Sequence, residues 1–349
     1  MGTALQRVLE KVGMQPHLWE STDGSRAVLL PHGGRVLALF TAQSDENFFW
    51  SHPALEDAGV AESFYAGSWW HNSGGDRTWL APEYELFFPD YPKPDTYFQP
   101  RQLDPGEYRL DVSAACASLT NNLQVQLFAS GKTVDATIEK TVTPATDPLK
   151  QLSEKRFDDL AYAGYTLRTK LTVQGSAGKT DAALGVWNLL QLPHGGEMFV
   201  ATHARAEVMP YFGTVPANDL EVYERVVRYR MQAAGEQKIG VGPGRVSGRT
   251  AYLHGSDENA ALVVRSFTVH PSGRYVDVPF GRQEAEGSAF QACNINSGLG
   301  SFAELEYHAP AISVSSGTRE MSDKSVLWAY RGPKSSLVEV ARLLVSTEL

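Results

Sequence analysis

The sequence has 349 residues, of which 42% are hydrophobic and 20% charged, with 31 glycines and 19 prolines. This balance predicts a globular, loop-rich chain. The formal net charge of −9 at pH 7 and the lack of a dense Lys/Arg run argue against a nucleic-acid partner, because clustered cations hold such partners. The two cysteines, Cys116 and Cys293, have no CxxC spacing and predict neither a disulfide framework nor a thiolate zinc site.

The N-terminal segment, residues 1–20, is predicted to contain a short amphipathic helix. Leu5, Val8, Leu9 and Val12 recur at helical spacing with charged residues between them. This segment lacks the uninterrupted apolar core of a secretion signal, and no apolar run is long enough to cross a bilayer. We therefore expect a cytoplasmic protein with no membrane partner, unless a signal peptide has been removed.

From residue 25 onward, short apolar or alternating runs are separated by Gly, Pro, Asn and Asp. These runs predict strands at Ala27–Leu30, Arg35–Phe40, Tyr108–Val112, Leu123–Phe128, Thr133–Val142, Gly164–Val173, Ala183–Leu192, Arg249–His254, Ala261–Val269 and Phe302–Tyr307. Alternating βαβ units are missing, which argues against a nucleotide-binding parallel sheet. Outside the N-terminal segment, helical spacing recurs only over 336–346, so the prediction is one antiparallel all-β domain over residues 1–349.

Three connections between these strands have informative compositions. Pro31–Val36 has the glycine pair of a hairpin turn and joins the first two predicted strands. Segment 82–107 is rich in Pro, Tyr, Phe and Asp and is too proline-dense for a sheet interior, so we expect a long ordered loop that forms the wall of a binding cleft. Segment 143–158 is polar and is predicted to be a surface connection.

Residues 69–83 carry three tryptophans, a histidine, an arginine and two carboxylates around a glycine pair. Glycines permit positive φ and close backbone approach, and aromatic rings beside the forked donors of Arg77 are typical of sugar binding. The alternative is a buried turn, in which the tryptophans belong to the core and Arg77 pairs with Asp76, Glu83 or Glu85. Composition alone leaves both interpretations open.

Short motifs follow one another in order between residues 30 and 330: Gly74 to Glu83, Gly185–Leu189, Lys238–Gly240, and Glu304–Glu306 with Trp328 after it. This set resembles the galactose mutarotase-like (aldose 1-epimerase-like) superfamily, and most closely its uncharacterised members of unknown function. The resemblance implies an all-β galactose mutarotase-like β-supersandwich with a few short helices. It also implies a concave face that binds a carbohydrate, with no cofactor.

In the aldose 1-epimerases that the chain resembles, a glutamate on a late strand and a central histidine transfer the protons. Glu304 and Glu306 lie two positions apart, so on a strand both side chains point to one face, and their repulsion raises the pKa of one of them. The alternative is a solvated outer face. Leu184 stands where the resemblance places the histidine, which leaves His194, His203 and His71 as replacements. The candidate catalytic residues are Glu304, Glu306 and His194.

Substrate binding is assigned to forked donors, aromatic platforms and nearby polar groups. Trp69 and Trp70 are further possible platforms. The candidate substrate-binding residues are Arg77, His71, Trp79, Glu83, Trp187 and Lys238. No metal site is expected, because His71 with Asp76, and His254 with Asp257 and Glu258, lack the spacing of a known metal cage.

The predicted function is binding of a small-molecule carbohydrate by a mutarotase-like protein. The activity that the resemblance implies is cofactor-independent epimerisation or isomerisation of a sugar or sugar derivative. The alternatives are a non-catalytic sugar-binding protein, and a glycan lyase or hydrolase on the same scaffold, since one fold hosts several activities. The sequence indicates neither which sugar is bound nor an oligomeric state.

Overall fold

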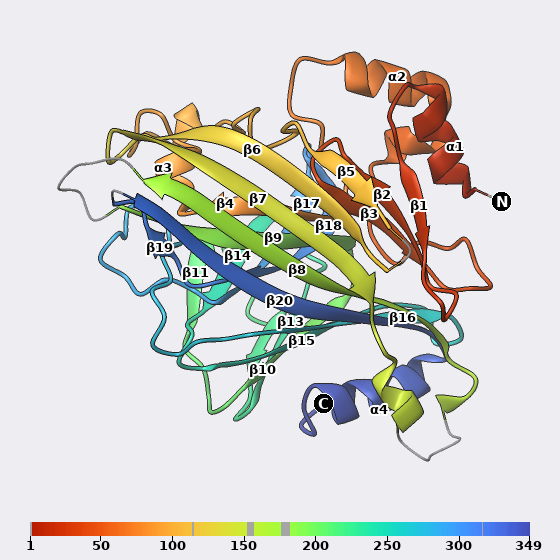
Figure 1. The fold of residues 1–349 in the computed structure, drawn as a ribbon. Coiled ribbons are helices and arrows are strands. Elements are labelled where there is room, and N and C mark those ends of the chain that lie inside the picture. The colour runs from red at the N-terminus through yellow and green to blue at the C-terminus, as the bar shows by residue number, and fades with distance from the viewer. Residues whose placement is uncertain (1, 114, 152–156, 176–181, 316) are drawn as a thin grey trace.

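The computed structural model describes residues 2–113, 115–151, 157–175, 182–315 and 317–349. Two large antiparallel sheets pack against each other, and short helices lie at the ends of the sheets (Figure 1). This arrangement confirms the expected all-β sandwich with a few short helices.

The first sheet carries most of the candidate site residues. Its strands are β1 (His17–Glu20), β2 (Arg26–Leu30), β3 (Arg35–Phe40), β4 (Asp76–Ala81), β9 (Ala183–Pro193), β11 (Val208–Phe212), β14 (Gly235–Val241), β17 (Phe290–Ser297), β18 (Gly300–His308) and β19 (Ile312–Ser313). They are arranged in the order β1-β2-β3-β4-β9-β18-β17-β14-β11, and β19 pairs with β9. The centre of the sheet therefore brings together strands from the first and last thirds of the chain.

The second sheet backs the first. Its strands are β5 (Arg109–Val112), β6 (Ala117–Leu127), β7 (Lys132–Pro144), β8 (Ala161–Gly175), β10 (Glu197–Thr202), β12 (Leu220–Val222), β13 (Val226–Arg230), β15 (Val246–Gly255), β16 (Ala260–Phe267) and β20 (Gly317–Gly332). They follow the order β12-β13-β10-β15-β16-β20-β8-β7-β6-β5.

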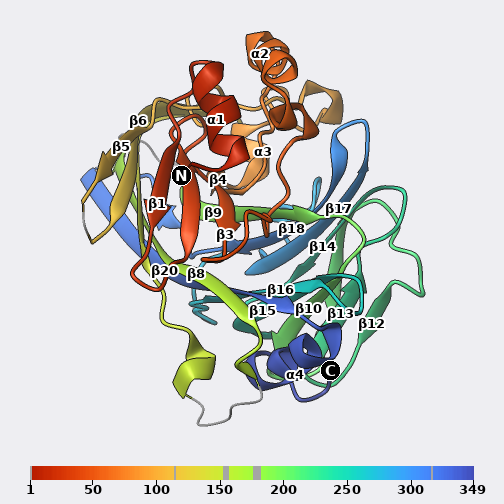
Figure 2. The same cartoon turned by 90° about the vertical axis from the view of Figure 1, so that its right-hand side faces the viewer.

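The helices are α1 (Ala4–Lys11), α2 (Ala58–Ala66), α3 (Glu83–Leu86) and α4 (Lys334–Leu344), and 3₁₀ turns occur at η1 (Pro53–Glu56), η2 (Pro94–Thr96) and η3 (Pro148–Gln151). Helices α1 and α2 lie together at one end of the molecule and α4 lies at the other (Figure 2). No helix in the described part of the chain is both long and apolar enough to cross a membrane.

The core lies between the sheets. One core cluster contains Leu190 and Leu192 of β9 and Ala303 and Leu305 of β18. These side chains pack with residues of the second sheet such as Leu167. Because side chains alternate along a strand, the residues between these positions project from the opposite face of the first sheet. That face is therefore free to build a site.

The predicted elements are largely confirmed. All ten predicted strands exist, Pro31–Val36 contains the turn between β2 and β3, and the two terminal helices are α1 and α4. The restriction of helices to the two ends was wrong, because α2 forms in the first third. Its apolar residues are spread around the helix, only Ala61 is buried, and Asp57 caps its start, so no one-sided pattern marks it.

The predictions for residues 69–83 and for segment 143–158 differ in part from the structure. The tryptophan-rich stretch contains the buried strand β4. The sequence did not predict this strand because a glycine pair precedes it and a proline follows it, and both are typical of turns. Within the polar segment 143–158, β7 continues to Pro144 and Leu149 is buried. Residues 152–156 of that segment lie outside the described residues.

Candidate functional site

A cavity of about 630 Å³ lies on the face of the first sheet that points away from the second. Five strands each contribute two side chains that are two positions apart, as expected for one face of a sheet. These pairs are Arg77 and Trp79 on β4, Trp187 and Leu189 on β9, Phe302 and Glu304 on β18, Cys293 and Ile295 on β17, and Glu236 and Lys238 on β14.

Two long connections complete the cavity wall. Segment 82–107 contributes Glu83, Phe88 and Tyr97, which confirms the predicted wall, and the connection between β16 and β17 contributes Phe280. Asp277 fastens this second connection to the site. One of its carboxylate oxygens accepts from the Glu83 backbone N–H at 2.9 Å, and the other accepts from the side-chain amide of Gln291 at 2.7 Å.

The glycine pair brings β4 into the sheet. Gly74 and Gly75 have φ of +99° and +74°, and a Cβ at Gly75 would lie 2.5 Å from the backbone oxygen of Val36. Glycine is therefore required for this close approach. Beyond the pair, strand alternation sends Asp76 toward the core, where it pairs with Arg265, and sends Arg77 into the cavity. The alternative in which Arg77 pairs with Asp76 is wrong for this reason.

Arg77 instead pairs with Glu304. Its Nη2 donates to Glu304 Oε1 at 2.9 Å, and Gln191 Nε2 donates to the same oxygen at 3.0 Å. The guanidinium carbon lies 4.4 Å from the centre of the Trp79 ring and 5.3 Å from that of Trp70. Arg77 Nε and Nη1 are buried without a hydrogen-bond partner, although the residue lines the cavity. These two nitrogens are therefore unpaired donors beside the cavity.

Asp104 holds the aromatic rings that flank Arg77. Its Oδ2 accepts from the indole N–H groups of Trp70 and Trp79 at 2.9 and 3.0 Å, and from Arg35 Nη2 at 2.8 Å. Asp104 and Arg35 are both buried. This one carboxylate therefore holds both tryptophan rings in place.

Behind the cavity wall, Glu306 is fully buried. Its Oε2 accepts from Trp187 Nε1 at 2.7 Å and pairs with Lys238 Nζ at 3.0 Å. Burial raises the pKa of Glu306 to about 7, against the influence of Lys238 and with a further contribution from Glu304. The predicted repulsion between the two glutamates is therefore present, but burial is the larger cause. Glu306 is not among the residues that line the cavity, whereas Glu304 is.

Lys238 projects into the cavity as a cation. Its ammonium lies 4.4 Å from the centre of the Trp187 ring and 5.6 Å from that of Tyr211. Burial lowers its pKa, but the charges of Glu306, Glu83 and Asp277 outweigh burial and raise the pKa well above its ordinary value. Lys238 therefore stays protonated at neutral pH and acts as a hydrogen-bond donor and a positive charge, not as a nucleophilic amine.

Glu83 begins the one-turn helix α3 and is half-buried at the cavity wall. Burial raises the pKa of Glu83 to about 7, Lys238 lowers it, and Asp277, Glu306 and Glu304 raise it further. A carboxyl group with this pKa is partly protonated at neutral pH and can donate or accept a proton.

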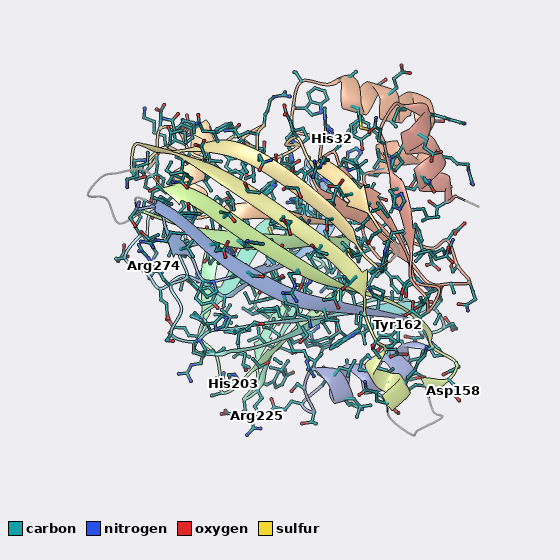
Figure 3. The ribbon with its side chains drawn as sticks, in the orientation of Figure 1. His32, Asp158, Tyr162, His203, Arg225 and Arg274 are labelled. Atoms are coloured by element: carbon teal, nitrogen blue, oxygen red, sulfur yellow. The ribbon has the colours of Figure 1, made fainter. Side chains whose placement is uncertain are left out.

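The histidines proposed from the sequence lie elsewhere. His194 is hydrogen-bonded to Asn294 at 3.0 Å, and His71 lies 3.2 Å from His32 and contacts the Gly67 carbonyl. His203 is exposed just after β10, near Arg225 (Figure 3). Among the described residues that line the cavity, none is a histidine.

One histidine that the sequence analysis did not select lies behind the site. His308 is buried and stacks on Trp187 with ring centres 5.4 Å apart. Burial lowers the pKa of His308 to about 4, so the imidazole is neutral at physiological pH. Leu184, at the position where the resemblance expects a histidine, is fully buried in an apolar cluster.

Cys293, Glu304 and Glu306 are a group whose potential metal-ligand atoms lie within 4.8 Å of one another. Their surroundings suit proton transfer better than a cation. Arg77 and Lys238 already pair with the two carboxylates, and burial raises the pKa of the Cys293 thiol well above its ordinary value. A metal ion bound here would have to compete with two fixed positive charges.

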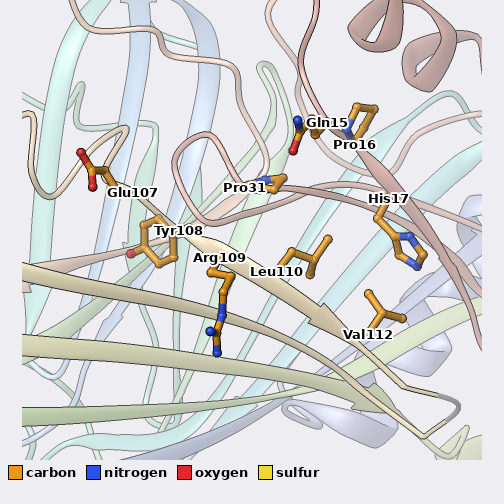
Figure 4. Close-up of a pocket in the computed structure, with 9 residues that line it drawn as sticks. All are labelled: Gln15, Pro16, His17, Pro31, Glu107, Tyr108, Arg109, Leu110 and Val112. Atoms are coloured by element: carbon orange, nitrogen blue, oxygen red, sulfur yellow. The ribbon is translucent and has the colours of Figure 1, made fainter.

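A second hollow, of about 760 Å³, lies between the start of β1 and strand β5 (Figure 4). Its lining includes Glu107, Tyr108, Arg109 and His17. Arg109 pairs with Asp111 on an exposed surface. This hollow lacks the buried charges and the ring-flanked donor of the first cavity, which remains the candidate site.

Comparison with known proteins identifies the family. A family model described as "Family of unknown function (DUF6786)" matches residues 8–349, so the chain belongs to this family. None of the curated proteins matches the sequence.

Solved structures are also similar to the chain. A galactose mutarotase-like protein from Lactobacillus casei ATCC 334 has 9% identity and a TM-score of 0.48, covering 90% of this chain and 100% of its own. A galactose 1-epimerase from Lactobacillus acidophilus NCFM has 8% identity and a TM-score of 0.44, covering 91% and 95%. A GH36 alpha-galactosidase from Geobacillus stearothermophilus has 9% identity and a TM-score of 0.34, covering 92% of this chain and 41% of its own. None of these similarities carries an activity to this chain.

Proposed function

We propose that this member of the DUF6786 family binds a neutral sugar ring in the cavity and moves protons on it with carboxyl groups, as a cofactor-independent epimerase or isomerase. The observation that carries the proposal is the Arg77–Glu304 pair. It lies at the cavity wall beside the rings of Trp70 and Trp79, and the Nε and Nη1 nitrogens of Arg77 have no hydrogen-bond partner.

The lining matches the two kinds of surface that a sugar presents. The half-buried ring of Trp70 and the exposed ring of Tyr97 offer apolar surface for the C–H face, and Arg77 and Lys238 offer donors for hydroxyl groups. The two cations are balanced by Glu304 and Glu306, and Glu83 adds a further acidic group. This balance favours a neutral ligand over a phosphorylated or carboxylated one.

Glu83 and Glu304, two of the three carboxyl groups that line the cavity, can divide the proton transfers of anomer exchange. In this proposal Glu304 accepts the proton of the anomeric hydroxyl, while protonated Glu83 donates its proton to the ring oxygen as the bond between that oxygen and the anomeric carbon breaks. Rotation of the resulting aldehyde and reversal of both transfers give the other anomer. Lys238 stabilises negative charge that develops during the exchange.

The test measures binding and turnover separately on neutral hexoses. Calorimetry gives the affinity, and exchange NMR gives the rate of anomer interconversion above the buffer rate, for the wild type, Glu304→Gln and Glu83→Gln. Glu62→Gln, at an exposed position on α2, is the matched control. We expect binding by all four proteins and a loss of at least 100-fold in exchange rate only for the two cavity variants. Absence of binding to every hexose would overturn the proposal.

A second candidate function is sugar binding without turnover. It is favoured by the hydrogen bonds of Glu304, whose Oε1 already accepts from both Arg77 and Gln191. A carboxylate oxygen that already accepts two hydrogen bonds can position a ligand without transferring a proton. Binding of a hexose by the wild type, with exchange no faster than in buffer, would select this second function.

A further inference from the structure

The mouth of the cavity is unusually apolar. Tyr97, Phe212, Phe280 and Leu299 line it and are 39%, 43%, 40% and 56% exposed. In the described part of the chain these are four of ten exposed large hydrophobic residues, and they come from four separate segments. Isolated exposed apolar residues are ordinary, but a group of them around one cavity indicates a binding surface.

Ring contacts join the apolar mouth to the inner end of the cavity around Arg77 and Trp79, which we call the cavity floor. Phe88 contacts Phe280 and Tyr97, with ring centres 5.0 and 5.2 Å apart. Tyr97 stacks on Phe87 at 5.8 Å, and Phe87 contacts Trp79 at 5.0 Å. A connected series of rings therefore runs from the Arg77 side of the floor to the outer edge. These contacts pass through buried Phe87 and join the mouth residues to Trp79, and both ends of the series line the same cavity.

Two polar groups near the mouth each have a partner. Glu236 accepts a hydrogen bond from Ser297 at 2.7 Å, and the Tyr97 hydroxyl interacts with the side chain of Gln99. A second sugar ring would bring several hydroxyl groups that need hydrogen bonds, whereas an alkyl or acyl chain needs none. The mouth therefore suits an apolar substituent better than a second sugar.

We propose that the natural ligand is a sugar that carries an apolar acyl or alkyl group, with the sugar ring at the floor and the apolar group between Phe212, Phe280 and Leu299. This inference rests on the proposed function. Because anomer exchange requires a free anomeric hydroxyl near Glu304, the apolar group is attached elsewhere on the ring. The reacting end then faces inward and the apolar end faces the opening.

Calorimetry with matched ligands tests this proposal. The ligands are glucose and galactose, their 6-O-octanoyl esters, the disaccharides maltose and lactose, and 1-octanoylglycerol as an apolar ligand without a sugar. We expect at least one ester to bind tenfold or more tightly than its parent hexose, and the disaccharides to gain less than threefold. An ester that binds no more tightly than its parent, or a disaccharide that gains as much as the ester, would overturn the inference.

Variants of the mouth locate the effect. Phe212→Ala and Leu299→Ser should remove most of the ester's advantage and leave the affinity for the parent hexose within twofold of wild type. Leu343→Ala changes a comparably exposed apolar residue on α4 and should change neither affinity. Persistence of the advantage in both mouth variants would contradict the proposed position.

The outcomes separate this inference from the proposed function. If hexoses bind and no ester binds more tightly than its parent, only the proposal of an apolar substituent is rejected. Failure of every hexose to bind removes both. Binding of 1-octanoylglycerol as tightly as the esters, while the hexoses still bind, removes only this inference.

Discussion

Arg77 and Glu304 are 227 positions apart in the sequence, and their side chains meet at 2.9 Å at the cavity wall. The sheet topology explains this distance. Strands β4 and β18 both pair with β9, one on each side, and Gln191 of β9 donates to the same carboxylate oxygen from between them. The pair therefore depends on three strands that come together only in the folded sheet.

Replacement of Arg77 by lysine tests the importance of the forked donor. Arg77→Lys keeps the charge but loses the planar group that lies beside the Trp79 and Trp70 rings, so we expect sugar affinity to fall at least tenfold. Calorimetry on a bound hexose measures this change. Arg319→Lys, on an exposed part of β20, is the control and should bind like wild type. Equal affinities for all three proteins would show that Arg77 makes no specific contact.

Asp104 is expected to be a major contributor to stability. Asp104→Ala leaves buried Arg35 without its carboxylate and both indole N–H groups without an acceptor, which should lower the free energy of unfolding by about 3–5 kcal/mol. Urea unfolding measures the loss. Asp45→Ala removes the more exposed partner of Arg26 and should cost less than about 1 kcal/mol. Similar losses for the two variants would contradict the role given to Asp104.

The raised pKa of Glu83 predicts a specific dependence of stability on pH. A folded-state pKa of about 7 lies above the ordinary value of 4.5, so the folded state binds more protons than the unfolded state between these two values. The stability contribution of Glu83 therefore falls as pH rises from about 4.5 through 7. We expect Glu83→Gln to be more stable than wild type at pH 8 by about 2 kcal/mol and similar to it at pH 5.

Unfolding of wild type and Glu83→Gln across this pH range provides the measurement. Glu62→Gln should follow the wild-type curve throughout. A stability difference between Glu83→Gln and wild type that does not change between pH 5 and pH 8 would show that Glu83 titrates normally.

Lys238 and Glu306 are expected to be energetically coupled. Each single change, Lys238→Met or Glu306→Gln, leaves a buried partner without its opposite charge, and the double change removes both. The double variant should therefore lose less stability than the sum of the single losses, with a coupling free energy above about 1 kcal/mol. Urea unfolding of the four proteins completes the cycle. Additive losses would mean that the pair contributes no net interaction.

Much of the fold was accessible from local sequence patterns. Alternation of apolar and polar residues marked strands such as β7, and the proline-rich composition of segment 82–107 marked a cleft wall. Strands such as β14 and β17 were missed because they carry buried polar residues, among them Gln237 and Asn294, which break up both an apolar run and an alternating pattern. The stability of such strands comes from the neighbours that they acquire in the folded sheet.

The candidate site was predicted in part. The structure brings Arg77, Trp79, Glu83, Trp187, Lys238 and Glu304 together, places Glu306 directly behind them, and leaves His71 and His194 outside the cavity lining. Asp104 and Phe280 were missed because each lies in an irregular connection, where only the three-dimensional arrangement shows what it contacts. A histidine carries no local signal that separates a catalytic role from a structural one.

Saturation-transfer NMR on neutral hexoses with wild type, Arg77→Lys and Glu304→Gln tests the central claim most directly. We predict transfer to the ring C–H protons of at least one hexose by wild type and by Glu304→Gln, because those protons would lie against Trp70 and Tyr97, and a transfer at least fivefold weaker in Arg77→Lys. Transfer to none of the hexoses, or equal transfer in all three proteins, would contradict a sugar site built around Arg77 and Glu304.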